Sequence, residues 1–408
     1  MQKIKRYAMS LPIKEVPSRF KALLSFYKKC FTRPQYKNFR DFVLGLIVSD
    51  NKTIQEINDC FGRVDQSSLN RFLTCSEWDP AKINNRRISQ IKSRHKLRRG
   101  IFICDPTTLI KFGKMMEYAN YHYSGMTKKA EWGYFLVNSF FTDGNTEFPV
   151  CADFYLREED ADEKHPFKTL REICLEQLDY AMKKLPIWLF IADAGLYADF
   201  IIQDLRARRL KYILGTRVTN NISIEGRKRI SIDDYLGRLT DLDFKQHIID
   251  GEVYYLHVVE VSERGVGKEK LLISYKDGDE EEIRVNVTNL LQHSDESILR
   301  LLLKRWKIET WHRDGKQHLG LEDCQVRKFG AIQKVVCAIL VAYTQLILMK
   351  EDRLLKPLNR ILETIGEGCR YLRLIALKGA FWLKQKAKDI MKFKKILNEQ
   401  VFVKNAKV

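Results

Sequence analysis

The sequence predicts an α/β protein in which a mixed sheet is flanked by helices. Two short apolar runs, 101–104 and 187–191, have the length of buried strands, and each lies close before an aspartate. Residues 142–145, Thr-Asp-Gly-Asn, separate two strand-like stretches and are typical of a hairpin turn. Residues 166–185 have the apolar spacing of an amphipathic helix that starts at a proline. Strands and helices that alternate in this way predict a layered α/β domain.

The remaining elements of this domain follow from the same patterns. The two hairpin strands are expected at 134–141 and 147–156, a second helix at 197–209 and a further strand at 212–214. The order is therefore three strands, a helix, a strand, a helix and a strand. We expect the first of these strands to end at Asp105.

Three regions are expected along the chain. Residues 1–95 have the apolar spacing of helices, 96–330 contain the α/β domain, and 331–408 are helical again. Short β-like runs separated by glycine and charged residues predict a β-rich insertion at about 218–292. A long helix should follow it, starting at Ser294 or the next residue.

The composition indicates a polyanionic partner. Lysine and arginine total 71 against 52 acidic residues, which gives a net charge of +19, and a lysine-rich tail spans 378–407. Nucleic acid is the first candidate for such a charge, and a basic but otherwise ordinary enzyme is the alternative. The nine cysteines include no C-x-x-C pair and no apolar run approaches the length of a membrane span. We therefore expect a soluble cytoplasmic protein with reduced thiols and no membrane partner.

Two short helices near the N-terminus resemble a helix-turn-helix. They are expected at 53–61 and 67–74, on either side of Gly62, and the second helix carries Asn70 and Arg71. These two side chains are candidate DNA contacts. Two packed helices joined by a glycine, with no role in DNA binding, are the alternative interpretation.

The two aspartates that follow the apolar runs are candidate metal ligands. A carboxylate just beyond the carboxyl end of a buried strand faces the crevice where α/β sheets bind ligands. If the two strands are neighbours, Asp105 and Asp193 lie close together, and their repulsion favours a hard cation between them. Alternatively, each aspartate caps the turn that follows it.

A third carboxylate lies on the predicted long helix. Arg305, Glu309, His312 and Lys316 recur at helical spacing and fall within roughly 40° of one another on one face. Cations that hold phosphates next to a metal-binding carboxylate suit a DNA backbone. A solvated face with an ion pair between residues four apart is the alternative.

These residues resemble the catalytic blocks of the insertion-sequence DDE transposases. The signature of that family is tyrosine, two residues, arginine, three residues, glutamate, six residues and lysine. This chain matches it at Arg305, Glu309 and Lys316 and departs at Leu302, which replaces the tyrosine. The family's first aspartate block is resembled by the segment Asp105-Pro106-Thr107-Thr108 of this chain, and its second by Asp193-Ala194-Gly195-Leu196-Tyr197.

The resemblance implies an RNase H-like core interrupted by a β-rich insertion. It also implies that Asp105, Asp193 and Glu309 hold two Mg²⁺ ions, with Mn²⁺ as a possible substitute, for DNA strand cleavage and strand transfer. Arg305 and Lys316 would contact phosphates of the transposon end, and His312, on the same predicted helical face, is a further candidate DNA contact. The expected partners are double-stranded DNA, both transposon ends with inverted repeats and target DNA, and a second copy of the chain.

One further departure from the family concerns DNA hairpin formation. Relatives that form a hairpin hold a flipped base with a tryptophan of the insertion, and here no tryptophan lies between Asp193 and Trp306. The candidate substitutes are aromatic residues of the insertion: Tyr235, Phe244, Tyr254 and Tyr255. Two other functions remain open, a transposase-derived DNA-binding protein that no longer cuts, and an RNase H-like repair nuclease or resolvase.

Overall fold

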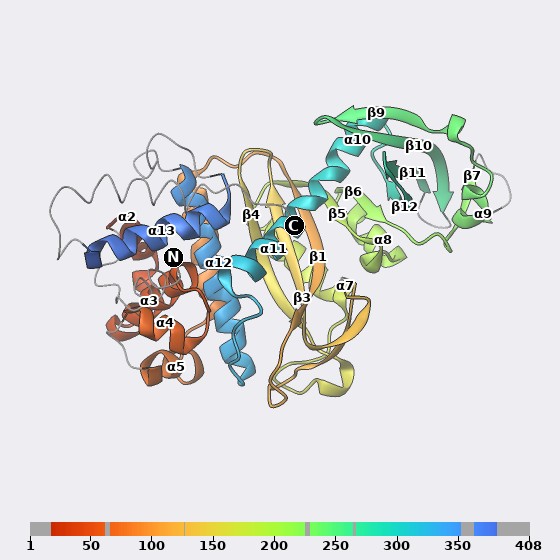
Figure 1. Ribbon diagram of the computed structural model, residues 1–408. Coiled ribbons are helices and arrows are strands. Elements are labelled where there is room, and N and C mark those ends of the chain that lie inside the picture. Colours follow the sequence, from red (N-terminus) through yellow and green to blue (C-terminus); the bar gives the residue numbers. More distant parts are fainter. Residues whose placement is uncertain are drawn as a thin grey trace. The chain divides into compact units, whose positions relative to one another are not determined.

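The computed structural model describes residues 18–61, 66–125, 127–224, 229–263, 267–351 and 363–381 (Figure 1). Within it the chain forms two compact units, each made of separate stretches of sequence. The first unit comprises Met1–Lys96, Thr108–Phe135 and Trp311–Val408, and the second comprises Leu97–Thr107 and Leu136–Thr310. Most of the lysine-rich tail, from residue 382 on, lies outside the described residues. The three consecutive regions expected from the sequence stay a prediction.

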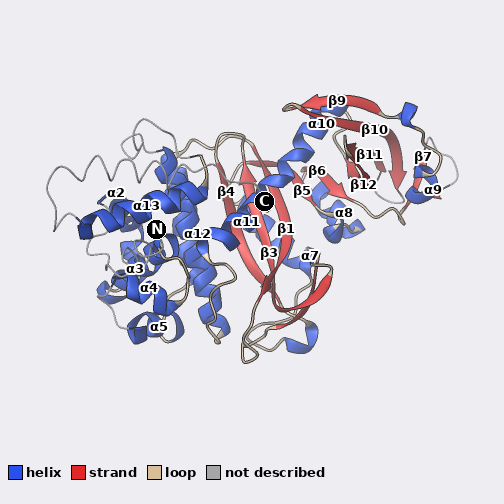
Figure 2. Cartoon of the chain, in the orientation of Figure 1, coloured by secondary structure: helices blue, strands red, loops and turns tan. Residues whose placement is uncertain are grey.

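The first unit is mainly helical, as Figure 2 shows. Its N-terminal helices are α2 (Ser18–Leu24), a 3-10 turn (Ser25–Cys30), α3 (Arg33–Val48), α4 (Ile54–Phe61), α5 (Gln66–Thr74) and α6 (Pro80–Arg94). They pack around an aromatic cluster in which the rings of Phe72 and Trp78 stack with their centres 5.3 Å apart. Its C-terminal helices are α12 (Phe329–Glu351) and α13 (Ile365–Phe381).

Helix α12 is the centre of this helical packing. It contacts α3, α5, α6 and α13. Among the described residues it is the one helix that is long and apolar enough to cross a bilayer, which corrects the expectation that no stretch would reach that length. Since 83% of its apolar 18-residue stretch is buried inside the protein, α12 has the character of a core helix.

The described residues form one mixed sheet of twelve strands. The strands are β1 (Gly100–Ile110), β2 (Asn120–Ser124), β3 (Lys129–Thr142), β4 (Glu147–Tyr155), β5 (Ile187–Ala192), β6 (Lys211–Gly215), β7 (Asn221–Ile224), β8 (Ile230–Ser231), β9 (Lys245–Ile249), β10 (Glu252–Glu263), β11 (Gly267–Lys276) and β12 (Asp279–Thr288). Their order is β2-β3-β1-β5-β6-β12-β11-β10-β7-β8, with β4 paired to β3 and β9 paired to β10.

The core of this sheet has the strand arrangement of an RNase H-like fold. Strands β4, β3 and β1 are neighbours, and β1, β5 and β6 are parallel. Helices α7 (Leu170–Met182) and α8 (Asp199–Ala207) make the crossovers before and after β5. Short 3-10 turns span Glu158–Asp160 and Ala194–Leu196. The predicted mixed sheet flanked by helices is therefore confirmed.

Strand β1 extends further than predicted. The sequence indicated an end at Asp105, whereas β1 continues to Ile110. Its pairing with β5 stops at Cys104 and Ala192, but β1 continues beside β3, and an added Cβ on Gly133 would lie 1.9 Å from the carbonyl oxygen of Leu109. Partner strand β3 therefore sets the length of β1, beyond its apolar run.

The insertion joins the core through its last strand. Strand β12 pairs antiparallel with β6 and also with β11, so the strands of the insertion continue the same sheet. The segment also contains helix α9 (Ile232–Leu236) and a 3-10 turn at Asp241–Asp243. The β-rich character expected between the second aspartate and the glutamate is thus present.

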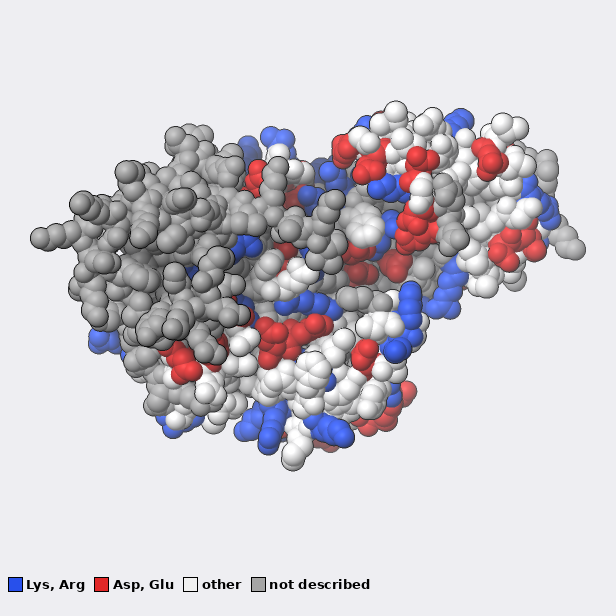
Figure 3. Space-filling view, viewed as in Figure 1, with Lys and Arg blue, Asp and Glu red and all other residues white. Residues whose placement is uncertain are grey.

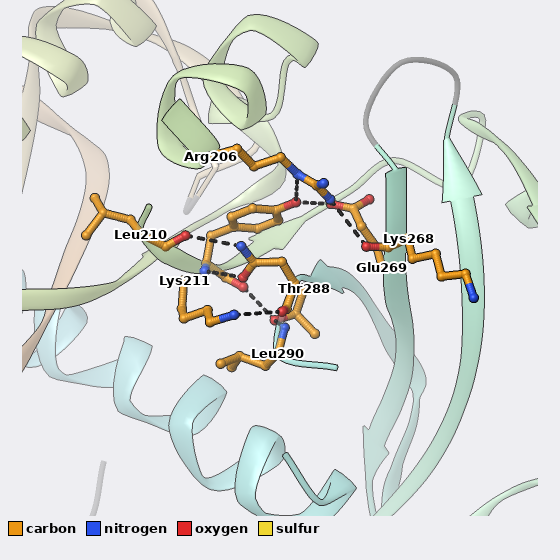
Figure 4. A network of polar contacts seen from close by, with 9 residues as sticks. Arg206, Leu210, Lys211, Lys268, Glu269, Thr288 and Leu290 are labelled. Atoms are coloured by element: carbon orange, nitrogen blue, oxygen red, sulfur yellow. Dashed lines mark hydrogen bonds and ion pairs between the residues drawn. The ribbon is translucent and has the colours of Figure 1, made fainter. Parts of the chain in front are cut away.

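A buried polar network connects the insertion to the core (Figure 4). The fully buried Glu269 of β11 accepts a hydrogen bond from the hydroxyl of Tyr212 on β6 and lies 3.6 Å from a guanidinium nitrogen of Arg206 on α8. The hydroxyl of Thr288 donates to the carbonyl oxygen of Tyr212 at 2.5 Å. Four elements of the second unit, β6, β11, β12 and α8, therefore share one polar network.

The helix after the insertion is interrupted. Helix α10 (Asp295–Leu302) starts where predicted, with the hydroxyl of Ser294 accepting from the backbone of Ser297. A 3-10 turn at Leu303–Arg305 follows before α11 (Trp306–Leu319) begins, so the single long helix expected from the sequence is wrong. Spacing alone predicted a regular helix, because a 3-10 turn shifts the period too little to alter the pattern.

Candidate active site

The two aspartates meet at the carboxyl edge of the parallel strands. Cys104 of β1 lies opposite Ala192 of β5, so Asp105 and Asp193 follow paired residues on neighbouring strands. Asp193 is exposed, and its side chain makes no capping hydrogen bond to the turn that it precedes. The alternative of a turn-capping role is therefore not realised for Asp193.

A glycine fixes the backbone at this edge. Gly215 ends β6, one residue beyond the pair formed by Ala192 and Leu214. A Cβ at Gly215 would lie 2.6 Å from the backbone nitrogen of Ala194 and 3.1 Å from the carbonyl carbon of Asp193. Only glycine allows the chain to pass this close to the second aspartate.

The third carboxylate is paired with an arginine of its own helical segment. A guanidinium nitrogen of Arg305 lies 2.9 Å from a carboxylate oxygen of Glu309, so the ion pair between residues four apart is present. Trp306, which is 44% exposed, lies between two guanidinium groups: those of Arg284 and Arg305 are 5.0 and 5.7 Å from the ring centre. Arg284 comes from β12, so the insertion contributes a cation to this site.

The three carboxylates influence one another electrostatically. Burial raises the pKa of Asp105 to about 7; the charge of Arg305 opposes this rise, and the charges of Asp193 and Glu309 add to it. Burial also raises the pKa of Glu309, against the lowering effects of Arg305 and Arg284. Neighbouring negative charges thus oppose the ionisation of Asp105 and Glu309, and Arg305 and Arg284 compensate them in part.

The donor chemistry of this cluster fits a hard divalent cation. Three carboxylates supply only oxygen ligands, and a cation between them would relieve their repulsion. In the described part of the chain, however, no three histidine, cysteine or acidic side chains are already gathered as a metal site. Glu309 would also have to share its oxygens with Arg305.

Lys316 and His312 lie in the first unit, and both are largely buried. The ammonium of Lys316 donates to the carbonyl oxygen of Thr108 at 2.8 Å and pairs with Glu322 at 3.0 Å. Only 8% of His312 is exposed. These contacts connect α11 to the end of β1, and they give the predicted DNA contacts of the two side chains no support.

The two candidate residues of the N-terminal helices lie on a surface. Asn70 and Arg71 are exposed on α5, whereas Leu69 and Phe72 are buried beneath them. Gly62, expected as the turn of the helix-turn-helix, lies outside the described residues. The exposed face of α5 is therefore available for a contact, and its partner stays a prediction.

Sequence reasoning missed Arg284, Gly215 and Trp306. Arg284 lies in a charged strand of the insertion, and only the pairing of β12 with β6 brings it near Glu309. Gly215 ends the run Tyr212-Ile213-Leu214, and a glycine directly after a buried strand was an available signal. Trp306 stands within the arginine–glutamate block itself.

Charge alone does not identify this site. On the face that Figure 3 shows, acidic and basic side chains are intermingled among the described residues. The net charge of +19 is therefore not displayed there as a field of one sign. Strand order and the position of the carboxylates, not surface charge, define the candidate site.

A sheet of this order, with two aspartates at the carboxyl edge of adjacent parallel strands, defines the class of RNase H-like domains with an acidic centre. Residues 26–238, slightly more than half of the chain, match the family described as DDE superfamily endonuclease, and the chain belongs to this family. The matched range includes Asp105 and Asp193 and ends before Glu309.

A curated relative is described as a probable transposase for insertion sequence element IS701 of Microchaete diplosiphon. It is 29% identical to this chain over 212 residues, which cover 50% of this chain and 55% of the relative. The chain thus matches about half the length of that relative.

Proposed function

We propose that the protein is a DDE transposase that cuts and joins DNA at the inverted-repeat ends of an insertion sequence. The observation that carries this proposal is that Asp105 and Asp193 follow paired residues of adjacent parallel strands, in the same unit as Glu309, in a DDE-family chain. The transposase assigned to the relative supports the same substrate class.

In this proposal Asp105, Asp193 and Glu309 hold divalent cations, with Mg²⁺ as the expected ion and Mn²⁺ as a substitute. Bound cations of this kind activate a water or 3′-hydroxyl and stabilise a leaving oxygen in phosphoryl transfer. The chain contributes the ligands, and the Gly215 approach fixes the backbone that carries Asp193. No protein nucleophile is required.

The arginines position the DNA. Arg305 and Arg284 supply guanidinium groups next to Glu309, where they can hold phosphate oxygens of the strand to be cut. Trp306, whose ring lies close to both guanidinium groups, is 44% exposed and can contact a nucleotide beside the cut. Asn70 and Arg71 on α5 are proposed contacts to the duplex, and two copies of the chain act on a pair of ends.

The test compares a labelled duplex carrying the terminal repeat with a shuffled duplex, in Mg²⁺ and with a target plasmid present. The proposal predicts a cut at the repeat end, a 3′-hydroxyl product and its joining to the plasmid, all absent for Asp193→Asn. Equal cutting of both duplexes without joining would instead indicate a nuclease or resolvase. Binding of the repeat without any cutting would indicate a DNA-binding protein.

A further inference from the structure

A segment of the first unit presents apolar side chains to solvent. The loop of residues 111–119, here called the wedge loop, carries Phe112 and Met115, which are 86% and 74% exposed. Tyr121 and Tyr123 on β2 are 54% and 64% exposed. In the described part of the first unit, these four are all of the large hydrophobic side chains that are exposed. A patch so concentrated indicates a binding surface.

The wedge loop is held firmly at its base. The buried ammonium of Lys111 donates to the carbonyl oxygens of Leu321, Glu322 and Cys324, at 3.3, 2.8 and 3.0 Å. The indole nitrogen of Trp132 donates to the carbonyl oxygen of Gly113 at 2.9 Å. Phe112 is therefore exposed on a backbone that is anchored on both sides before any partner binds.

The β2–β3 ribbon adds an aromatic face beside this loop. Tyr121 pairs across the ribbon with Trp132 at a ring distance of 5.3 Å, and Tyr123 pairs with Ala130. Residues opposite each other point to the same side of a ribbon, so these four share one face. His122 and its partner Glu131 point to the other side.

Cations surround the apolar tip. Four basic residues are exposed on the loop, at the turn between β2 and β3 and on the chain segment bonded to the loop: Lys114, Lys128, Arg327 and Lys328. Lys129, paired with Ser124, lies on the other face of the ribbon. Two of the acids nearby, Glu117 and Glu131, are engaged or turned away, whereas Asp323 stays exposed. The carboxylate of Glu117 accepts from the backbone of Phe329 at 2.8 Å, and Glu131 lies on the opposite face. An apolar tip within a basic surround complements duplex DNA, which presents phosphates around a stacked, apolar interior.

We propose that the wedge loop and the β2–β3 ribbon bind duplex DNA, with Phe112 and Met115 inserting at a flexible base step while the surrounding cations hold phosphates. The inference rests on the proposed function, because it assigns a DNA surface outside the carboxylate site. A second copy of the chain fits this patch less well, since a symmetric contact would place four cations against their counterparts.

The test measures base unstacking without cleavage. A short duplex with 2-aminopurine at a central TA step is titrated with the full-length protein in EDTA. Wild type should raise the 2-aminopurine emission, and Phe112→Ala should remove the rise and weaken binding about tenfold. Leu242→Ala is the matched control, because Leu242 is 97% exposed in the second unit. Lys128→Gln should weaken binding and reduce its salt dependence but keep the rise at saturation.

Each other outcome overturns the assignment. No rise with wild type at saturation, or an equal rise with Phe112→Ala, would contradict insertion. Conversion of an oligomer to a monomer by Phe112→Ala would make the patch an interface between copies. Unstacking is measured in EDTA and cutting in Mg²⁺, so the two proposals can fail separately. A protein that unstacks DNA but never cuts it would contradict the proposed function alone. A protein that cuts DNA without unstacking it would contradict only the insertion of Phe112.

Discussion

The backbone beside Asp193 depends on the missing side chain of Gly215. Since an added Cβ would meet backbone atoms at 2.6 and 3.1 Å, no rotation of a flexible group can relieve the contact. Gly215→Ala should therefore displace Asp193 and lower the rate of end cleavage by roughly tenfold to a hundredfold, with DNA affinity retained. Cleavage rate and gel-shift affinity, measured on the same duplex, separate the two effects.

Gly251→Ala provides a control for the loss of a glycine. Its Cβ would meet nothing within 4 Å, although its φ of +85° makes the substitution mildly strained. Cleavage by Gly251→Ala should equal that of wild type. A Gly215→Ala protein that cuts at the wild-type rate would show that this close approach does not position Asp193.

Asp314, on α11, makes stability depend on pH. Burial raises its pKa from 3.8 to about 6, against the opposing charges of Arg313 and Lys350. The folded protein therefore binds this proton more tightly than the unfolded chain. The resulting stabilisation is complete below about pH 4 and is lost as the pH rises through about 6. Asp314→Asn should raise the unfolding free energy at pH 8 by roughly 1–3 kcal/mol and leave it nearly unchanged at pH 4.

Denaturant unfolding at the two pH values measures this difference. Asp250→Asn is the matched control, because the side chain of Asp250 is 90% exposed and its charge is solvated. An equal gain for Asp314→Asn at both pH values would mean that packing, not the ionisation of the carboxylate, accounts for the effect.

At the scale of elements, the network around Glu269 attaches the insertion to the core. Removal of Glu269 leaves the Tyr212 hydroxyl without its acceptor, while the Arg206 side chain, 32% exposed, loses its ion pair and stays partly solvated. Glu269→Ala should destabilise the protein by roughly 1–3 kcal/mol. Tyr212→Phe, which removes one donor, should cost roughly 1–3 kcal/mol.

Thermal unfolding and limited proteolysis measure how firmly the network attaches the insertion to the core. Glu260→Ala, on the exposed part of β10, is the control and should not alter either result. We expect proteolysis of Glu269→Ala to begin within the insertion, between β6 and α10. Unfolding of Glu269→Ala at the wild-type temperature would contradict a structural role for the network.

The elements that the sequence predicted best are those whose burial is visible in their own run of apolar residues. Strand β5 is buried between two parallel neighbours, so its apolar run predicted both the strand and the position of Asp193 after it. The second half of β1 contains a proline and two threonines and depends on β3, a partner that a local pattern does not reveal. For the same reason the contribution of Arg284 to the site required the structure.

At the scale of the whole molecule, the chain reaches each unit more than once. Strand β1 begins in the second unit and ends in the first, and α11 likewise begins in the second unit and ends in the first. The sequence indicated one helical face for Arg305, Glu309, His312 and Lys316, although Arg305 lies in the 3-10 turn just before α11. The sequence could not indicate that the first pair belongs to the acidic cluster and the second pair to the packing of the first unit.

The most direct measurement is the rate of cleavage at the terminal repeat by wild type, Glu309→Gln and Glu296→Gln, in Mg²⁺ and in EDTA. Glu296 lies on α10 and pairs with Arg300 at 2.7 Å, so it controls for loss of a paired carboxylate. We predict cleavage by wild type and Glu296→Gln in Mg²⁺ alone, and a loss of roughly a thousandfold for Glu309→Gln. Cleavage in EDTA, or wild-type cleavage by Glu309→Gln, would contradict a metal centre built on these three carboxylates.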